Sequence, residues 1–381
     1  MKSRVVIVEC TEYGQEIVSQ AVKRGIDLLG GIGQFARKNE TLLLKPNLLA
    51  GDLPEKSVTT HPAVFRAVAN IFGNHGIKMI YGDSPAMGST LKAAHKSGLK
   101  TVADELNIPL SDFKNSQKVH YPRALVARHL TLARTVLEAD GIINICKMKT
   151  HALTGITGAI KNCFGCVPGF LKEEYHLKMK DIHLFCSMLV DIAAFVKPRL
   201  HIMDGIMAME GNGPRSGNNK KMNVLLFSTD PVALDSVFCQ LINLDPLYVP
   251  YLKIGQNSGL GICIPENIKI VGDELRRYVR PDFNINRRPI RKLTLAQNLP
   301  YFINNMIISR PLIDYRLCTN CGSCIRQCPV PEKAVNWRPG KKEEMPCYDY
   351  SRCIRCFCCQ EICPEKAISI RTPLLGKILF R

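Results

Sequence analysis

Two segments near the C-terminus carry cysteines in one repeated pattern. Residues 318–329, CTNCGSCIRQCP, and residues 353–364, CIRCFCCQEICP, share the spacing C-x2-C-x2-C-x3-C-P. A four-iron cubane needs four thiolates that converge on it from different directions. Three cysteines spaced by two residues wrap around three corners, whereas the three-residue gap carries the fourth away to the other cluster. The spacing therefore predicts two 4Fe-4S clusters with exchanged fourth ligands: Cys318, Cys321, Cys324 and Cys363 for the first cluster, and Cys353, Cys356, Cys359 and Cys328 for the second.

A zinc ribbon is the structural alternative, since paired C-x-x-C motifs also bind zinc. Zinc would need only two cysteine pairs, not two full quartets that each end in Cys-Pro. Cys358 takes the position that Ser323 holds in the first segment, so we interpret it as a supernumerary thiol. Cys347 is likewise not needed as a ligand.

The region from about 311 to 371 resembles the bacterial two-cluster ferredoxins, which implies one-electron transfer through two adjacent clusters. Free ferredoxins of this type tend to be acidic, whereas this region is rich in lysine and arginine. The basic residues are Arg326, Lys333, Arg338, Lys341, Lys342, Arg352 and Arg355. This composition favours a module that transfers electrons to a site in the same chain, or one that docks an acidic electron donor, over a freely diffusing electron carrier.

A second candidate site lies in the segment KMKTHALTGITGAIKNCFGCVPG, residues 147–169. It follows the apolar strand GIINIC, and we expect it to open a helix at about Leu153. Helix N-termini after strand ends bind anions in α/β sheets. The segment therefore predicts a site for a phosphate or carboxylate, formed by Lys147, Lys149, His151, Thr154, Thr157 and Lys161. The alternative is a basic surface helix with one incidental histidine.

Three further features lie in the same part of the chain. The glycine-rich stretch DGIMAMEGNGPRSG (204–217) should follow a strand, and it offers Glu210, for which a catalytic or metal role and no role are equally favoured. It matches neither the dinucleotide nor the P-loop motif. Asp230 before Pro231 is typical of a helix N-cap. The Cys163/Cys166 pair is interpreted as buried structural thiols in preference to a redox pair.

The elements that position these residues alternate along the first 275 residues. Strands are expected at 4–9, 41–47, 77–83, 141–147, 199–205 and 223–229, and helices at 14–30, 62–75, 88–98 and 230–242. Apolar strands separated by helices predict an α/β fold, a mostly parallel sheet with helices on both faces. A small C-terminal α+β two-cluster ferredoxin-like domain should follow. We therefore expect four regions: 1–275, a basic linker at 276–310 with a probable helix over 293–307, the cluster domain at 311–371, and a basic-apolar tail at 372–381.

Several short motifs along residues 1 to 275 occur in a characteristic order: KPN, THP, GDSP, KMKTH, TGAIKN, EGNGP and DPVALD. This series resembles the domain of unknown function 362, which is often fused to two-cluster ferredoxin modules. By motif, the resemblance implies a cleft lined by Lys45, Asn47, Asp83, Lys147, Lys149, His151, Lys161, Asn162 and Glu210.

Charge and hydropathy narrow the class of protein. The formal net charge is +18, with 20 basic against 8 acidic residues from Arg276 to the C-terminus. The single tryptophan argues against a base-stacking nucleic-acid surface. The first ten residues lack a secretory signal, and the apolar stretch 184–196 is short and contains Asp191, so it predicts a buried helix rather than a membrane span. We expect a cytoplasmic protein whose cysteines serve metal or redox chemistry.

Two functional hypotheses follow. In the first, the protein is an oxidoreductase. Electrons reach a small anionic substrate that the lysines of the cleft bind. Lys149 is a catalytic candidate, and His151 or Glu210 transfers protons. In the second, it is an electron carrier or assembly protein whose α/β domain only docks a partner. A third, a nucleic-acid surface with clusters as staples, has the least support.

Overall fold

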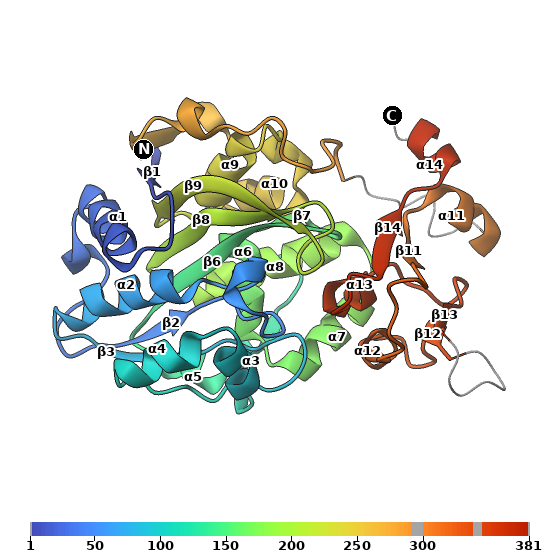
Figure 1. Ribbon diagram of the computed structural model, residues 1–381, viewed down its shortest axis with the longest axis horizontal. Helices are drawn as coiled ribbons and strands as arrows, with labels where there is room; N and C mark the ends of the chain where they lie inside the picture. Colours follow the sequence, from blue (N-terminus) through green and yellow to red (C-terminus); the bar gives the residue numbers. More distant parts are fainter. Residues whose placement is uncertain (1, 291–299, 338–344, 380–381) are drawn as a thin grey trace.

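The computed structural model describes residues 2–290, 300–337 and 345–379. Its large unit is an eight-stranded mixed sheet in the order β10-β1-β9-β8-β6-β2-β3, with β7 paired to β6 (Figure 1). The strands are β1 Ser3–Glu9, β2 Thr41–Lys45, β3 Lys78–Tyr81, β6 Gly141–His151, β7 Gly155–Thr157, β8 Leu200–Glu210, β9 Asn218–Ser228 and β10 Ile268–Gly272. All neighbours in this order run parallel except β9, which is antiparallel to both β1 and β8.

Helices cover both faces of this sheet, as expected for strands that are apolar throughout. The helices of the large unit are α1 Gln15–Leu28, α2 Pro62–Gly73, α3 Thr90–Lys96, α4 Leu99–Glu105, α5 Arg134–Glu138, α6 Ala159–Asn162, α7 Gly169–Lys178, α8 Ile182–Val196, α9 Pro231–Leu241 and α10 Pro250–Asn257. Along β6, Ile143 and Ile145 enter the core shared with α1, α2 and α4, whereas Ile142 and Cys146 enter the core shared with α8 and α9. The predicted α/β fold with helices on both faces is confirmed.

Short elements complete the large unit. A hairpin is formed by β4 Ser116–His120 and β5 His129–Ala133. The 3-10 turns are η1 Ile32–Gln34, η2 Pro54–Lys56, η3 Cys163–Cys166, η4 Pro246–Tyr248, η5 Pro265–Asn267 and η6 Leu275–Tyr278.

The cysteine-rich unit contains α11 Tyr301–Ile307, β11 Arg310–Ile313, α12 Ser323–Arg326, β12 Val335–Asn336, β13 Cys347–Tyr348, α13 Cys358–Ile362, β14 Ile368–Arg371 and α14 Leu374–Leu379. Two antiparallel pairs, β11 with β14 and β12 with β13, hold its two halves together. Each cysteine segment contains one short helix, α12 or α13, and these helices pack against each other. The unit lies against one side of the α/β domain, next to α7 (Figure 1).

Two sequence predictions about local structure are wrong. No helix opens at Leu153: β6 continues to His151, turns through Gly155 at φ +82°, and pairs back through β7, so that α6 begins only at Ala159. The strand expected to end near Asp204 instead extends as β8 to Glu210, because β9 pairs with it over its whole length. In both cases hydrogen bonding to a neighbouring strand outweighs the local sequence pattern.

Other local predictions are confirmed. The stretch 184–196 lies within α8 and is largely buried, and Asp230 caps α9 by accepting hydrogen bonds from the amides of Val232 and Ala233. Within the described part of the chain, no helix is both long and apolar enough to cross a membrane. The first part of the helix expected over 293–307 lies outside the described residues, and α11 forms its last part.

Candidate functional site

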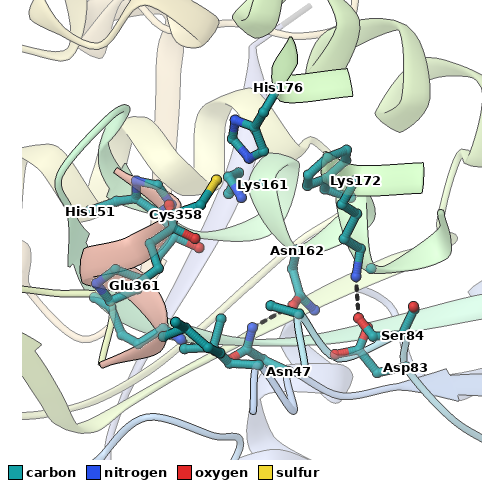
Figure 2. Close-up of a pocket in the computed structure, with 18 of the residues that line it drawn as sticks. Asn47, Asp83, Ser84, His151, Lys161, Asn162, Lys172, His176, Cys358 and Glu361 are labelled. Atoms are coloured by element: carbon teal, nitrogen blue, oxygen red, sulfur yellow. Dashed lines mark hydrogen bonds and ion pairs between the residues drawn. The ribbon is translucent and has the colours of Figure 1, made fainter. Parts of the chain in front are cut away.

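A cavity that opens to solvent lies between the α/β domain and the cysteine-rich unit, with about 710 Å³ of space when its open mouth is included. Its polar walls come from the ends of β2 and β6, from α6, α7 and from α13 (Figure 2). The polar side chains in its lining that are able to bind or react with a ligand include Asn47, Asp83, Lys149, His151, Thr157, Lys161, Asn162, Lys172, His176, Cys358 and Glu361. One wall of the cavity is therefore built by the helix that precedes the cluster-ligand candidate Cys363 and contains Cys359.

Two of the predicted lysines are neutralised by buried carboxylates. Lys45 Nζ lies 2.9 Å from Asp83 Oδ1, and Lys147 Nζ lies 2.8 Å from Asp204 Oδ2. Lys147 also donates to the Tyr13 hydroxyl at 2.8 Å and does not line the cavity. These two lysines stabilise the ends of β2 and β6, so their positive charge is already compensated inside the protein.

Three other lysines face the cavity without such a carboxylate. Lys149 donates to Asn47 Oδ1 at 2.8 Å and to the Val58 carbonyl at 2.7 Å. Lys161 lies over the Phe164 ring, 4.9 Å from its centroid, and Lys172 donates to the Ser84 carbonyl. Among residues 2–290, 300–337 and 345–379, no carboxylate lies within 4.0 Å of these three ammonium groups.

Burial makes these lysines unusually acidic. It lowers the pKa of Lys149 to about 7, with repulsion from Lys147 and Lys161 adding to the effect. Burial lowers the pKa of Lys172 to about 7 as well, and it lowers that of Lys161. A group of mutually repelling ammonium groups in a desolvated space binds an anion strongly, because the anion restores the missing counter-charge.

His151 connects the α/β domain to α13. Its Nδ1 accepts hydrogen bonds from the amides of Leu153 at 3.1 Å and Thr154 at 3.4 Å, so the neutral ring carries its hydrogen on Nε2. Nε2 lies 3.1 Å from Glu361 Oε1. Burial lowers the pKa of His151. Burial alone would raise the pKa of Glu361, but His151 and Lys161 bring it down to about 2. His151 is thereby held in a defined tautomer with Nε2 toward the cluster unit.

Two asparagines brace the floor of the cavity. Asn47 Nδ2 donates to Asn162 Oδ1 at 3.0 Å, and Asn162 Nδ2 donates to Asn144 Oδ1 at 2.6 Å (Figure 2). The bonds fix the amide orientations, and Asn47 Oδ1 in turn positions Lys149. Of the residues predicted for the cleft, the structure thus brings together Asn47, Asp83, Lys149, His151, Lys161 and Asn162.

Glu210 lies away from this group. Its carboxylate accepts a hydrogen bond from the Asn284 amide at 2.8 Å, and it does not line the cavity. The loop that follows it instead contacts the cluster unit. Gln360 Nε2 donates to Asn212 Oδ1 at 2.8 Å, and Arg215, paired with Asp52 at 2.9 Å, donates to the Ile362 carbonyl at 2.5 Å. The glycine-rich loop therefore holds α13 in place against the cavity.

The repeat cysteines lie near one another in the cysteine-rich unit. The thiols of Cys318, Cys321, Cys324 and Cys363 line one cavity of about 340 Å³. Burial and the three neighbouring thiols raise the pKa of Cys324 to about 12. In the other group, burial and then the neighbours Cys356 and Cys328 raise the pKa of Cys353. Cys363 thus lies with three cysteines of the first repeat, and Cys328 lies near Cys353 of the second. The division of the eight cysteines between two clusters stays a prediction.

The donor set fits a cubane better than a single ion. Over the described ranges, no three His, Cys, Asp or Glu side chains converge closely enough to hold one metal ion. Thiolates of a 4Fe-4S cluster are spread over four irons, so they surround a wider space than the ligands of zinc. The cavity with four thiols in its lining matches the wider arrangement.

Residues 310–364, which hold the repeated cysteines, match the 4Fe-4S dicluster domain, so the α/β domain is joined to an iron–sulfur unit. Residues 42–240, more than half of the chain, match the Domain of unknown function (DUF362). The chain belongs to the DUF362 family.

One similar protein is the thylakoid-associated protein sll1697 of Synechocystis sp., which is 36% identical over 261 residues, 68% of this chain and 81% of the relative. A structure of the lactate racemase apoprotein from Thermoanaerobacterium thermosaccharolyticum is also similar, with 14% identity and a TM-score of 0.40. The alignment covers 64% of this chain and 57% of that protein, a likeness too slight to bear on function.

Several residues of the cavity were missed by the sequence patterns, among them two on α7 and two on α13. Lys172 and His176 are four residues apart and therefore lie on one face of α7, a spacing that could have indicated a site. Cys358 and Glu361 come from α13, and nothing in the sequence shows that this helix closes a cavity of the other domain. The supernumerary thiol Cys358 lies close to Lys161 there (Figure 2).

Tyr348 contacts one of the predicted ligands directly, which gives a test by redox potential. Its hydroxyl donates to Cys359 Sγ at 3.2 Å. A donor to sulfur stabilises the reduced, more negative cluster. Tyr348→Phe should lower the potential of the second cluster by about 20 to 60 mV, since one net hydrogen bond contributes about 0.5–1.5 kcal/mol. Potentiometric titration followed by electron paramagnetic resonance (EPR) measures this shift.

Tyr350→Phe is the matched control, because the Tyr350 hydroxyl donates to the Pro311 carbonyl and to no sulfur. An unchanged potential in Tyr348→Phe, or an equal shift in both variants, would contradict the role of this hydrogen bond.

Proposed function

We propose that this protein is an oxidoreductase that transfers electrons to a small anionic substrate bound in the 710 Å³ cavity. The observation that carries the proposal is that α13 belongs to both sites. Its residues Cys358 and Glu361 line the cavity. In the sequence they alternate with the ligand candidates Cys356, Cys359 and Cys363. Two 4Fe-4S clusters held by the eight thiolates supply single electrons. Fusion of the two units keeps the electron source permanently beside the site.

The cavity side chains have separate tasks in this proposal. Lys161, Lys149 and Lys172 bind the anionic group, since they supply uncompensated positive charge. Lys149 has a pKa of about 7 and is therefore able to donate a proton near neutral pH. His151 presents Nε2–H toward Glu361, which keeps the ring fixed. Phe164 and Ile362 supply apolar parts of the lining.

The test is a screen under anaerobic conditions. The protein is reduced chemically, freed of reductant and mixed with mono- and dicarboxylates and with phosphate esters, while the visible absorbance of the clusters is followed. Saturable reoxidation by one class of small anion supports the enzyme. Reoxidation only by an added acceptor protein would favour the electron-carrier hypothesis and overturn the proposal.

Variants of α7 make the screen specific to the cavity. Lys172→Met should lower the reoxidation rate, whereas Lys178→Met is the matched control on the same helix, because Lys178 is exposed and pairs with Glu174. Equal rates in both variants would remove Lys172 from the site.

Binding of an anion should weaken as pH rises through neutrality. Lys149 and Lys172 bind an anion only when protonated, and the pKa of each is about 7. For each lysine that must be protonated, affinity should fall by about tenfold between pH 6 and pH 8. Sulfate is a suitable probe, because its own charge is constant over this range. Calorimetric titration at fixed ionic strength measures the slope, and an affinity that stays constant or rises with pH would contradict this assignment.

A cytoplasmic location remains our prediction. The name of the Synechocystis relative associates that protein with thylakoids, so fractionation of cells into membrane and soluble parts is the direct test.

A further inference from the structure

The first cluster site opens to solvent at one cysteine. Of the seventeen cysteines, only Cys321 is exposed. It lines the 340 Å³ cavity together with its partners Cys318, Cys324 and Cys363. The large cavity, by contrast, is lined by Cys358 and Gln327, which adjoin the second group of ligands. The two groups therefore face different surroundings: the first has an edge at the protein surface, and the second adjoins the buried cavity.

Exposed apolar side chains surround this edge. Leu317, which precedes Cys318, is 51% exposed, and Tyr315 is 45% exposed. Tyr315 donates to the carbonyl of Pro346, a residue that lines the same small cavity. The single tryptophan, Trp337, also lies here: a Cβ added at Gly322 would meet its indole at 3.2 Å. Apolar and aromatic side chains around an exposed redox ligand are typical of an interface core.

Basic side chains flank the apolar ones. Arg316 is exposed, with 88% of its side chain accessible, and Arg326 lies 3.3 Å from the position of a Cβ at Gly322. Arg326 donates to the Ser323 hydroxyl at 3.2 Å, and in the described parts of the chain no carboxylate lies within 4.0 Å of it. Arg316 forms an ion pair with Asp314, with 2.7 Å between Nη2 and Oδ2. Arg326 therefore places a positive charge at the rim of this face, whereas Asp314 offsets Arg316 and Glu365 also lines the small cavity.

The charge of the bound clusters does not reverse this sign. Residues 300–381 contain 13 lysines and arginines and 7 aspartates and glutamates, a surplus of six. Two oxidised clusters would bring about −2 each. The net charge of the cluster unit thus remains positive. Opposite charge on a partner protein increases its rate of association with this unit, and with it the rate of electron delivery.

We propose that Cys321, Leu317, Tyr315 and Trp337, with Arg316 and Arg326 at the rim, form the docking surface for an acidic one-electron carrier protein. Each encounter moves one electron from the reduced centre of the carrier to the cluster site at Cys321, and no bond or proton changes place. Because this surface is separate from the large cavity, the inference does not depend on the substrate proposed above.

The test uses the two-cluster holoprotein and a chemically reduced, acidic bacterial ferredoxin as the probe. In anaerobic stopped-flow mixing at low salt, the Arg316→Glu/Arg326→Glu variant should be reduced about 10 to 100 times more slowly than the native protein. High salt should remove most of this difference by screening. Dithionite, a small reductant that needs no docking, should reduce both proteins at similar rates.

The control variant Lys23→Glu/Arg276→Glu makes the same change in net charge on exposed residues of the α/β domain. It should keep the native rate within about twofold. An equal loss in both variants would mean that net charge alone acts, and a native rate in the Arg316/Arg326 variant would mean that the carrier docks elsewhere. Either result overturns the proposal.

A second measurement uses only the native protein, so its result does not depend on whether the variant retains its clusters. The reduction rate by the acidic ferredoxin should fall steeply as salt increases, since attraction between opposite charges is screened. A rate that is independent of salt, or that rises with salt, overturns the proposal without any substitution.

Discussion

Cys328→Ser is expected to abolish the second 4Fe-4S cluster although Cys328 belongs to the first repeat. Iron in anaerobically purified protein should fall from about eight to about four per chain. The reason is geometric: Cys353 is flanked by Cys356 and Cys328, whereas Cys324 is flanked by Cys318, Cys321 and Cys363. Iron and sulfide analysis with EPR of the reduced protein measures the loss.

Double variants identify which cluster is lost. Cys328→Ser/Cys356→Ser should retain as much iron as either single variant, because both residues serve one cluster. Cys328→Ser/Cys321→Ser should lose both clusters, because Cys321 serves the first cluster and Cys328 the second. If the first pair loses all iron and the second retains half, the fourth ligands are not exchanged and the assignment is wrong.

Cys358→Ser is the control within the same segment. The first repeat has Ser323 at the equivalent position, and both side chains are buried. The variant should therefore retain about eight irons. Loss of iron would show that Cys358 is itself a ligand.

The second large effect is expected from two lysines that lie close in sequence but have different surroundings. Lys161→Met should weaken sulfate binding by about 30-fold or more, since the loss of one partner of a buried charge pair costs about 2–5 kcal/mol. The free energy of unfolding should change less than in Lys147→Met, because Lys161 has no carboxylate within 4.0 Å in the described residues, although it lowers the pKa of Glu361.

Lys147→Met should have the opposite profile. Lys147 compensates the fully buried Asp204, and an unpaired buried carboxylate costs about 3–5 kcal/mol of stability. Urea unfolding under anaerobic conditions measures this loss, and calorimetry measures sulfate affinity. A stable Lys147→Met protein, or undiminished sulfate binding by Lys161→Met, would contradict the division between structural and cavity lysines.

Much of the candidate site was predictable because it follows strand ends. Asn47 follows β2, and Lys149 and His151 end β6, so parallel neighbours bring them to one edge of the sheet. The spacing of residues did not distinguish Lys147 from Lys149. Residues two positions apart share one face of a regular strand, and the register of β6 against β8 shifts between these two lysines, an irregularity that the sequence pattern does not show.

Glu210 shows a second limit of predicting site residues from the sequence. A carboxylate in a glycine-rich stretch is compatible with catalysis, but the extended β8 carries it away from the cavity, to the Asn284 amide. The loop after it contacts α13 through Asn212 and Arg215. Contacts between distant segments of this kind have no local signature.

The sequence by itself determined the fold class and predicted the ligand groups. Both depend on short-range periodicity: the cysteine spacing sets which thiols reach one cube, and apolar strands between helices require a sheet covered on both faces. Only the tertiary structure decided which lysines remain uncompensated and that α13 closes the cavity with Cys358 and Glu361. The physical reason is that burial and counter-charge arise from residues more than 200 positions apart, such as His151 and Glu361. Their energies depend on distance in space rather than along the chain.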